Sequence, residues 1–460
     1  MKIRGIGPER VKEALKNGEV TISVYGLGKL GLPLSLILAD TGARVIGVDV
    51  NPGLIKRINE GISPIPFEPG VNELLRKALK EKRFRATTDG KKAAEESDVM
   101  VIVVPVLTDD IGRPDLTTIR SVASTISEGL SAGDVIITET TLPPGTTLSL
   151  GKYMEARCGL KLGKDFGVAH APERTMSGRM IKDITLSYPK IVGASDRETL
   201  LAVKGIYEAI NKRGVIEVSN PTVAEAVKIF EGVYRDVNIA LANELALYSE
   251  IMGFDVIEAI RAANTQPYSH LHMPGAGVGG HCIPIYPYFI IENAKRKGLE
   301  MKLLSTAREV NDKMPFHVVY LTVKALNDRG KTVKGSTVLI LGLTYRSGVK
   351  EYYKSPALKI IKELKDMGAK VYAYDPLTTK DEVVEMGAYP WENNGVDAVI
   401  VVNDDKIFRD MIYEGKVKVN DVIIDARRAL DPRKIIDMGV KYWGVGYPQP
   451  GEECGFSRGA

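Results

Sequence analysis

A single cysteine follows three glycines and a histidine in the segment AGVGGHCIPIYPYF, residues 276–289. Gly277, Gly279 and Gly280 allow a ligand to approach closely and can aim backbone N–H groups at a developing oxyanion. The same N–H groups, together with the adjacent histidine when it is protonated, would favour the thiolate form of Cys282 over the thiol. Because the thiolate is the nucleophile, this segment predicts that Cys282 forms a covalent bond with a substrate.

The remaining thiols and the histidines do not indicate a metal site. Cys158 and Cys454 lie far apart with no metal-type spacing, and we expect both to be buried and inert, as free cysteines usually are. His270, His272 and His281 form a possible ligand set, but no carboxylate or further cysteine completes a suitable spacing beyond the cysteine next to His281. We therefore expect no bound metal.

The segment GLGKLGLP places Gly26, Gly28 and Gly31 in a G-x-G-x-x-G pattern directly after an apolar run. Such glycines allow a tight turn and let the backbone approach a pyrophosphate at the start of the next helix. Asp49 ends the following apolar run, where an acid holds the adenosine ribose hydroxyls and repels a 2′-phosphate. The pattern favours an NAD site over a merely structural turn. Together with a nucleophilic Cys282, it indicates aldehyde oxidation, in which hydride leaves for NAD and a thioester is then hydrolysed.

Short apolar runs alternate with helical patterns towards both ends of the chain. VTISVY, RVIGVDV, DVMVIVV and DVIITE come early, and STVLILGL, AKVYAYDP, DAVIVV and DVIIDA come late. Apolar strands separated by helices indicate a parallel sheet covered on both faces. We expect an α/β protein with two doubly wound Rossmann-like domains, joined by a long central helix and a helical middle domain. The predicted boundaries are 1–218 for the NAD-binding domain, 219–325 for the middle domain and 326–460 for the C-terminal domain.

The middle domain opens with a long helical pattern. Asn220 can cap this helix, and Pro221 suits its first position. Apolar residues then recur at steps of three and four as far as Gly253, which predicts a helix of about 33 residues, roughly 50 Å long. These apolar positions are Val223, Val227, Phe230, Val233, Val237, Leu241 and Leu245. A helix of this length can join two domains and still offer one face to a partner subunit.

The composition of the 460 residues is that of an ordinary globular protein, with 44% hydrophobic and 26% charged residues. The net charge of +4 comes from 62 basic and 58 acidic residues, which argues against a nucleic-acid-binding surface. No apolar run reaches the roughly 20 residues that span a bilayer, and the charged N-terminal segment lacks the apolar core of a signal peptide. We expect a cytoplasmic protein without a membrane segment. The acidic pair Asp109 and Asp110 fits a solvated loop.

The late α/β half carries GLTYRSG where a second glycine-rich loop would fall, with only Gly342 and Gly348. We therefore expect this half to bind a nucleotide carried by the substrate rather than a second dinucleotide. A simple two-electron hydroxyacid dehydrogenase would leave both this half and Cys282 unexplained.

Five segments of the chain resemble the motifs of one enzyme family: TETTLPPGTT, HAPERTMSGR, AEAVKIFEGVYRDVNIALANELA, GVGGHCIP, and GLTYRSG followed by SPA. In this order they resemble the UDP-sugar dehydrogenases of the UDP-glucose/GDP-mannose dehydrogenase superfamily, and the resemblance extends from about residue 20 to about residue 445. His281 and the segment RDVNIALANEL are most similar to UDP-N-acetylmannosamine dehydrogenases, with UDP-N-acetylglucosamine 6-dehydrogenases second. UDP-glucose dehydrogenases usually have a small residue in place of His281.

The resemblance implies that the sugar 6-hydroxymethyl group is oxidised to a carboxylate with two NAD, through a thiohemiacetal and a thioester on the cysteine. With UDP-N-acetyl-D-mannosamine the product would be UDP-N-acetyl-D-mannosaminuronate, for surface polysaccharide or glycan synthesis. The resemblance also implies a homodimer built on the central helix, and UDP held mainly by the C-terminal domain.

The site residues of the family correspond to particular positions of this chain. By this match Cys282 is the nucleophile, Lys228 stabilises the alkoxide and thiohemiacetal oxygens or assists proton removal, and Glu173 assists water attack on the thioester. Without the resemblance, Lys228 in an apolar helical run would be read as a surface lysine. The matching cofactor-binding residues are Gly26, Gly28, Leu30, Gly31, Asp49 and Thr141. The matching nucleotide-sugar residues are Arg174, Thr175, Arg235, Gly279, Arg346 and Arg427. Arginine suits a diphosphate because its planar fork donates two hydrogen bonds at once.

Several positions depart from the family pattern. Gly232 stands where the helix usually carries asparagine one turn after the lysine, although glycine costs about 1 kcal/mol relative to alanine inside a helix. Tyr286 replaces an aspartate four residues after the cysteine, and Tyr353 replaces an arginine. The other departures are Val106, Gln266 and Tyr268. These changes affect the prediction of thioester hydrolysis and of the sugar more than that of the first hydride transfer. They also motivate an alternative, a catalytically weak sensor that binds UDP-sugar and NAD.

Overall fold

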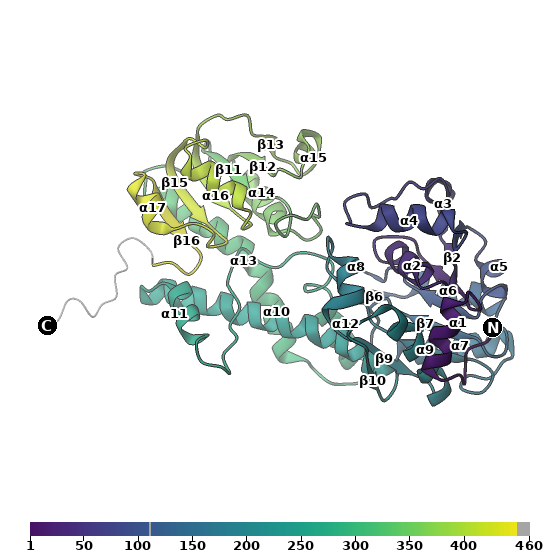
Figure 1. Ribbon diagram of the computed structural model, residues 1–460. Helices are drawn as coiled ribbons and strands as arrows, with labels where there is room; N and C mark the ends of the chain where they lie inside the picture. Colours follow the sequence, from purple (N-terminus) through teal and green to yellow (C-terminus); the bar gives the residue numbers. More distant parts are fainter. Residues whose placement is uncertain (110–111, 449–460) are drawn as a thin grey trace. The chain divides into compact units, whose positions relative to one another are not determined.

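The computed structural model describes residues 1–109 and 112–448. These residues form two compact units, and Figure 1 labels many of their helices and strands. The first unit comprises Met1–Glu231 and Tyr288–Asn293, and the second comprises Gly232–Pro287 and the described residues from Ala294 onward. The three domains predicted from the sequence have other boundaries, and their division stays a prediction. Within the described ranges, no helix has the length and apolar character needed to cross a bilayer.

The first unit is built on a sheet of eight strands in the order β10-β9-β8-β7-β4-β1-β2-β3. Neighbouring strands pair in parallel except β8 and β9, which are antiparallel. The strands are β1 Thr21–Tyr25, β2 Arg44–Val48, β3 Phe84–Thr87, β4 Val99–Ile102, β7 Val135–Thr138, β8 Gly167–His170, β9 Lys190–Ala194 and β10 Val215–Val218. The predicted parallel sheet is confirmed, and the antiparallel pair is an addition that the apolar runs did not indicate.

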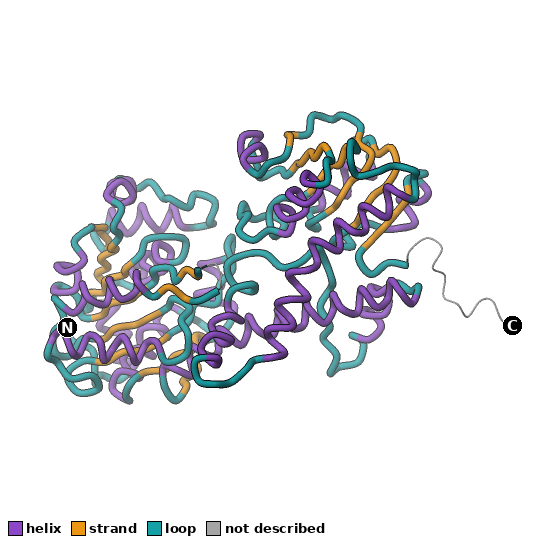
Figure 2. The backbone as a smooth tube through the Cα atoms, turned by 180° about the vertical axis from the view of Figure 1, so that it is seen from behind, coloured by secondary structure: helices purple, strands orange, loops and turns teal. Residues whose placement is uncertain are grey.

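Helices cover both faces of this sheet, as Figure 2 shows for the orange strands and purple helices. Along β1, Ile22 and Val24 pack with α1, α2 and α9, whereas Tyr25 packs in the cluster that contains α6 and α7. Burial on both faces explains why the strands are apolar throughout. The helices are α1 Pro8–Lys16, α2 Gly31–Asp40, α3 Pro52–Asn59, α4 Val71–Lys80, α5 Gly90–Glu95, α6 Thr117–Ser127, α7 Thr146–Cys158, α8 Met180–Lys182 and α9 Arg197–Ile210, with a π-helical turn at Asp183–Ser187. A small hairpin pairs β5 Leu107–Thr108 with β6 Pro114–Asp115.

The long helix α10 runs from Pro221 to Met252, 32 residues in all. The Asn220 side chain accepts a hydrogen bond from the Val223 N–H at 3.1 Å, which caps the first turn. Gly253, with a φ of +76°, follows the last residue of the helix. The helix predicted from Asn220, Pro221 and the apolar steps is therefore confirmed at both ends. Its residues belong to the first unit as far as Glu231 and to the second unit afterwards.

The second unit contains a six-stranded parallel sheet in the order β13-β12-β11-β14-β15-β16. Along β11, Val338 and Ile340 pack in the cluster that contains α13 and α14, whereas Leu339 and Leu341 pack in the cluster that contains α16 and α17. The strands are β11 Thr337–Leu341, β12 Lys370–Tyr374, β13 Tyr389–Pro390, β14 Val396–Val401, β15 Val419–Asp425 and β16 Lys441–Gly444. The remaining helices are α11 Val256–Ala263, α12 Tyr286–Lys295, α13 Lys302–Asn327, α14 Pro356–Asp366, α15 Lys380–Glu385, α16 Lys406–Tyr413 and α17 Pro432–Asp437. The second α/β half is thus confirmed.

Candidate active site

The loop between β1 and α2 carries the three glycines of the predicted dinucleotide motif. Gly26 has a φ of +100°, a conformation that favours glycine. A methyl group on Gly31 would lie 1.8 Å from the Gly26 carbonyl oxygen, so only glycine lets α2 begin this close to the strand. A side chain at position 28 would extend into open space. Leu30 immediately precedes α2. The loop therefore presents bare backbone at a helix start, which a pyrophosphate requires.

Asp49 follows β2 and is held against this loop. Its Oδ2 accepts a hydrogen bond from the Leu27 N–H at 3.0 Å, and its Oδ1 accepts one from the Asn51 N–H at 3.0 Å. The strand β1 lies between β2 and β4, so the direction of strand order reverses beside the loop. Ligands of open α/β sheets bind at this kind of switch point. The carboxylate is therefore positioned where the adenosine ribose of a dinucleotide is expected.

Thr141 lies in the segment between β7 and α7, and the start of α7 is held by a side chain of α10. Glu225 accepts hydrogen bonds from the Gly145 N–H at 2.5 Å and from the Thr147 N–H at 2.6 Å. Burial raises the pKa of Glu225 to about 7, although these donors oppose the shift. No local sequence pattern predicted this contact. It attaches the Thr141 segment to the helix that carries Lys228 one turn further on.

Glu173 and Lys228 both belong to the first unit, after β8 and on α10 respectively. The Lys228 residue is only 6% exposed, so it is not the surface lysine that its helical setting alone would suggest. Burial raises the pKa of Glu173, whereas the positive charge of Lys228 lowers it. The Thr175 N–H donates a hydrogen bond to Glu173 Oε1. The structure therefore brings two predicted catalytic side chains close enough for their charges to interact.

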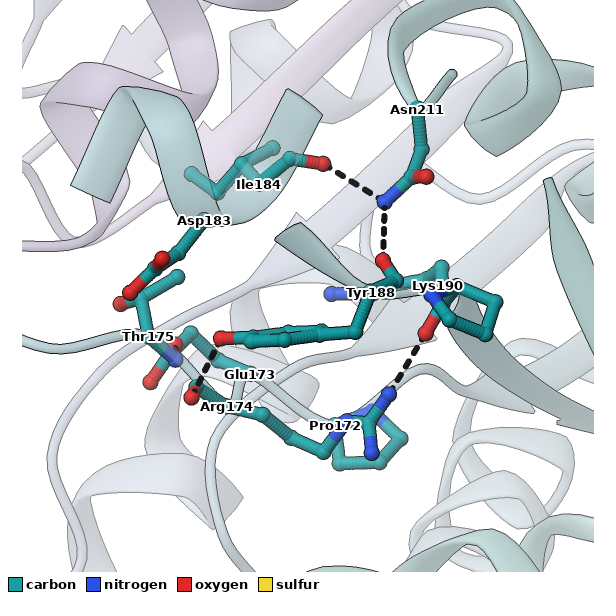
Figure 3. Close-up of a pocket in the computed structure, with 10 residues that line it drawn as sticks. Pro172, Glu173, Arg174, Thr175, Asp183, Ile184, Tyr188, Lys190 and Asn211 are labelled. Atoms are coloured by element: carbon teal, nitrogen blue, oxygen red, sulfur yellow. Dashed lines mark hydrogen bonds between the residues drawn. The ribbon is translucent and has the colours of Figure 1, made fainter. Parts of the chain in front are cut away.

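Arg174 and Thr175 line a small pocket beside Glu173, shown in Figure 3. The Arg174 guanidinium donates to Pro189 O at 2.5 Å and to Glu231 Oε1 at 2.8 Å, and it lies 4.7 Å from the centre of the Tyr188 ring. The Thr175 hydroxyl oxygen is buried and has no hydrogen-bond partner among the described residues. Protein groups thus fix the orientation of Arg174, and its contact with a nucleotide sugar stays a prediction.

A buried charged group lies beside this pocket. The Lys190 ammonium donates to Glu139 Oε2 at 2.7 Å and lies 4.8 Å from the centre of the Tyr207 ring, while the Tyr207 hydroxyl donates to the other Glu139 oxygen. Burial, assisted by the charge of Lys190, lowers the pKa of His170 to about 3, so this imidazole is neutral at pH 7. The charge of Lys190 also lowers the pKa of Glu173. These long-range contacts were not predicted from the sequence.

The glycines before Cys282 lie in the second unit against residues of its α/β half. A methyl group on Gly279 would lie 2.6 Å from Tyr345 Cβ, and the Gly280 N–H donates to Tyr353 O at 2.8 Å. The His281 ring stacks on the Tyr353 ring with 4.3 Å between centres and 1° between planes. Close packing therefore requires these glycines, and the Gly280 N–H, one of the predicted oxyanion donors, already has a protein acceptor.

Cys282 is half-buried just before α12. The Tyr286 hydroxyl lies 3.2 Å from Cys282 Sγ and donates a hydrogen bond to it, and the Tyr286 N–H donates to Cys282 O at 2.9 Å. Cys158 is also half-buried, but it lies at the end of α7. Cys454 lies outside the described residues. Cys282 is thus a cysteine with a hydroxyl donor at its sulfur.

Arg427 follows β15 and lines an open groove of about 870 Å³ in the second unit. The other basic side chains of this groove are Arg261, Arg409, Arg428, Arg433 and Lys434. The groove is also lined by Asp255, Asp404 and Asp431. Its basic side chains outnumber these acids, and the resulting positive charge suits a diphosphate. Arg346 lies in the segment after β11, and its Nε is buried without a hydrogen-bond partner in the described part of the chain. Arg235 lies on α10. Burial of His272 lowers the pKa of this imidazole, and the positive charge of Arg235 lowers it further.

Three family models match consecutive parts of the chain. They are the NAD-binding domain of the UDP-glucose/GDP-mannose dehydrogenase family at residues 20–211, its central domain at 222–313 and its UDP-binding domain at 339–432. The chain belongs to the UDP-glucose/GDP-mannose dehydrogenase family. It is therefore an NAD-dependent UDP-sugar dehydrogenase, and NAD as cofactor is confirmed.

Relatives of known name agree on this class of enzyme. The chain is 36% identical to a UDP-N-acetyl-D-mannosamine dehydrogenase of Pyrococcus horikoshii, over 92% of this chain and 99% of the relative. The solved structure of a UDP-D-ManNAc dehydrogenase from Pyrococcus horikoshii has a TM-score of 0.82 and 33% identity, and covers 93% of this chain and 99% of that one. An NDP-N-acetyl-D-galactosaminuronic acid dehydrogenase from Methanosarcina mazei has a TM-score of 0.80 and 29% identity, and covers 95% and 98%. The names differ in the sugar.

Other candidates from the sequence lie away from these groups. Asp109 is exposed and its Oδ2 accepts a hydrogen bond from Arg113 Nε at 2.7 Å, whereas Asp110 lies outside the described residues. In the part of the chain that the structure describes, no three His, Cys, Asp or Glu side chains are grouped as a metal ion would require.

Proposed function

We propose that this family member oxidises the C6 hydroxymethyl group of UDP-N-acetyl-D-mannosamine to a carboxylate, giving UDP-N-acetyl-D-mannosaminuronate. The name of the Pyrococcus horikoshii relative supports this choice of sugar. The observation that carries the four-electron chemistry is Cys282, a half-buried thiol on a glycine-rich loop with the Tyr286 hydroxyl 3.2 Å from its sulfur. UDP-N-acetylglucosamine and UDP-glucose are the runner-up substrates.

The proposed chemistry assigns one task to each predicted catalytic residue. Gly26, Gly28, Leu30, Gly31, Asp49 and Thr141 would hold NAD, which would supply the hydride acceptor for each oxidation. The Cys282 thiolate adds to the aldehyde carbon, and the buried Lys228 ammonium stabilises the oxygen that becomes negatively charged. After the second oxidation, Glu173 takes a proton from the water that attacks the thioester. Burial raises the pKa of Glu173, which makes this carboxylate a better proton acceptor.

The nucleotide of the substrate is assigned to the basic groove of the second unit. Arg427 lines this groove, and its charge suits a diphosphate. Arg235, Gly279 and Arg346 belong to the same unit, whereas Arg174 and Thr175 belong to the first. All six stay proposed nucleotide-sugar contacts.

We also propose a homodimer formed through α10. Large apolar side chains of this helix are exposed, among them Phe230 at 59%, Tyr234 at 53% and Ile251 at 77%. An exposed apolar patch of this kind is typical of an interaction surface. A cytoplasmic location stays a prediction from the sequence.

The decisive measurement is the number of NADH formed per UDP-sugar consumed, with each of the three sugars tested separately. A ratio near two with UDP-N-acetyl-D-mannosamine is the expected result. A ratio near one would mean that the second oxidation or the hydrolysis has been lost. Binding without NADH formation from any sugar would favour the sensor.

Cys282→Ala is expected to abolish formation of the uronate, because no thioester can form without the thiol. Cys158→Ala provides the matched control, since this thiol lies at the end of α7, and it should leave the NADH ratio unchanged. Undiminished uronate formation by Cys282→Ala, measured by mass spectrometry of the product, would refute the covalent mechanism.

A further inference from the structure

Two positions that depart from the family pattern contact each other in the second unit. Gly232, in place of asparagine, lies on α10, and Tyr286, in place of aspartate, begins α12. A methyl group on Gly232 would lie 3.0 Å from Tyr286 Cδ2 and 3.4 Å from Tyr286 Cβ. A contact of 3.0 Å is tighter than side chains normally adopt, so any side chain at position 232 would have to displace the ring. The glycine thus provides the space that the tyrosine occupies.

The Tyr286 side chain is aimed at the sulfur of Cys282. Its hydroxyl oxygen lies 3.2 Å from Sγ, and the residue is only 9% exposed. The backbone fixes the same pair, because the Tyr286 N–H donates to Cys282 O at 2.9 Å in the first turn of α12. A phenylalanine would fill the same space beside Gly232, so packing alone does not account for the hydroxyl.

We propose that Tyr286 is a catalytic residue that donates a hydrogen bond to the Cys282 thiolate, and that Gly232 is a positioning residue that admits the Tyr286 ring. This inference rests on the proposed function, in which Cys282 is the nucleophile. The two departures from the family pattern are then one coupled change rather than two separate losses.

The hydroxyl acts wherever negative charge resides on the sulfur. In the free enzyme it stabilises the thiolate and so increases the fraction of nucleophile. When Sγ bonds to the aldehyde carbon, the carbonyl electron pair moves to oxygen and the sulfur loses its charge. During hydrolysis, water adds to the thioester carbon and loses a proton to Glu173. The C–S bond then breaks, its electron pair returns to sulfur, and the Tyr286 hydroxyl again donates to the thiolate.

The test is the rate at which iodoacetamide alkylates Cys282 at pH 7, followed by mass spectrometry of the peptide that contains it. The full-length protein is used without substrate. Tyr286→Phe keeps the ring but removes the donor, and it is expected to slow alkylation about three- to fourfold. A tenfold loss of thiolate, as for one hydrogen bond to a charged acceptor, is partly offset because the remaining thiolate is a stronger nucleophile. Tyr288→Phe makes the same chemical change on the same helix and should leave the rate unchanged. Equal rates for wild type and Tyr286→Phe would overturn the proposal.

A second variant tests the role of the glycine. Gly232→Ala should displace the ring by a few tenths of an ångström and slow alkylation two- to threefold. It should have no further effect in the Tyr286→Phe background, where no hydroxyl remains to be displaced. An equal slowing in both backgrounds would show that Gly232 acts independently of the hydroxyl, and would overturn its positioning role. Thermal unfolding of each variant, followed by circular dichroism, reports whether both units are folded, and this readout does not depend on the sulfur.

The outcomes separate this inference from the proposed function. If alkylated wild-type protein still forms uronate, the covalent mechanism fails whatever Tyr286 does. If alkylation abolishes uronate formation but Tyr286→Phe is alkylated as fast as wild type, the inference alone fails. If both hold, Tyr286→Phe should also lower kcat for uronate formation about tenfold while leaving the KM for UDP-sugar little changed.

Discussion

The turn that follows β1 in the first unit and the turn that follows β11 in the second have the same backbone plan. Gly26 and Gly342 have φ values of +100° and +95°. Each donates its N–H to the last residue of the neighbouring strand, Gly26 to Val48 O at 2.8 Å and Gly342 to Tyr374 O at 3.0 Å. An aspartate follows that strand in both cases. The two halves therefore share one local arrangement, in which a strand is followed by a glycine turn and an aspartate follows the neighbouring strand.

The two turns differ in what fills them. Asp375 accepts hydrogen bonds from Leu343 N at 2.9 Å and Thr344 N at 3.1 Å and is 3% exposed, whereas Asp49 is partly exposed. The Asn403 amide donates to Thr344 Oγ1 at 3.1 Å and occupies the space beside the second turn.

The start of the following helix differs as well. The helix α2 begins at Gly31, close to its turn, whereas α14 begins only at Pro356. A dinucleotide needs bare backbone at a helix start, and the first turn alone supplies it. A shared hydrogen-bond plan therefore does not by itself make a cofactor site.

The largest expected effect comes from adding a methyl group to each turn. Gly31→Ala should weaken NAD binding about 100-fold, because its methyl would lie 1.8 Å from Gly26 O and force α2 away from the strand. Gly342→Ala should lower the thermal unfolding midpoint, since its methyl would lie 2.7 Å from Asn403 Cγ, but leave the Kd for NAD unchanged. Calorimetric titration with NAD measures both. Weaker NAD binding by Gly342→Ala would contradict the distinction between the turns.

The two aspartates should separate binding from stability. Asp49→Asn is expected to weaken NAD binding about tenfold, the effect of one hydrogen bond to a charged group, and to reduce discrimination against NADP. Asp375→Asn should instead lower the free energy of unfolding by about 1–3 kcal/mol, because the carboxylate accepts several buried donors. Urea unfolding and NAD titration of both variants provide the measurements. Equal losses of NAD affinity in the two variants would contradict the assignment of binding to Asp49 and of stability to Asp375.

The smallest expected effect is a change of stability with pH. It arises because the acid that caps a helix has a raised pKa in the first unit and a lowered pKa in the second. Burial raises the pKa of Glu225 at α7 to about 7 from 4.5. The corresponding stabilisation is complete below pH 4.5 and is lost as the pH rises through about 7. Wild type should therefore lose on the order of 2 kcal/mol of stability relative to Glu225→Gln between pH 5 and pH 8. Urea unfolding at both pH values measures this.

An acid of the second unit should show the opposite sign. At α15, Glu382 has its pKa lowered to about 2, first by a hydrogen bond from Lys350. Its stabilisation is present above pH 4.5 and is lost as the pH falls. Glu382→Gln should therefore be less stable than wild type above pH 4.5, and the difference should shrink as the pH falls from 4.5 towards about 2. The same pH trend for both variants would show that these caps do not differ in charge state.

Family resemblance and local patterns predicted the two α/β halves, NAD as the cofactor and the family itself, and these are confirmed. The same patterns did not indicate that β9 pairs antiparallel with β8, or that Glu225 caps α7. Lys228 could be read from its helix alone as a surface residue, yet it is buried. Each miss concerns a contact between segments that are distant in the chain.

The sequence by itself determined the features that depend only on residues close together in the chain, such as helix ends and turns. Asn220 and Pro221 begin α10 and Gly253 ends it, and the glycines of the first turn allow its backbone conformation, because these effects act within one or two helical turns. Only the tertiary structure decided that Tyr286 fills the space left by Gly232 and donates to Cys282 Sγ. Such contacts depend on how packed elements are aligned, and a displacement of one residue along a helix would give each side chain a different partner.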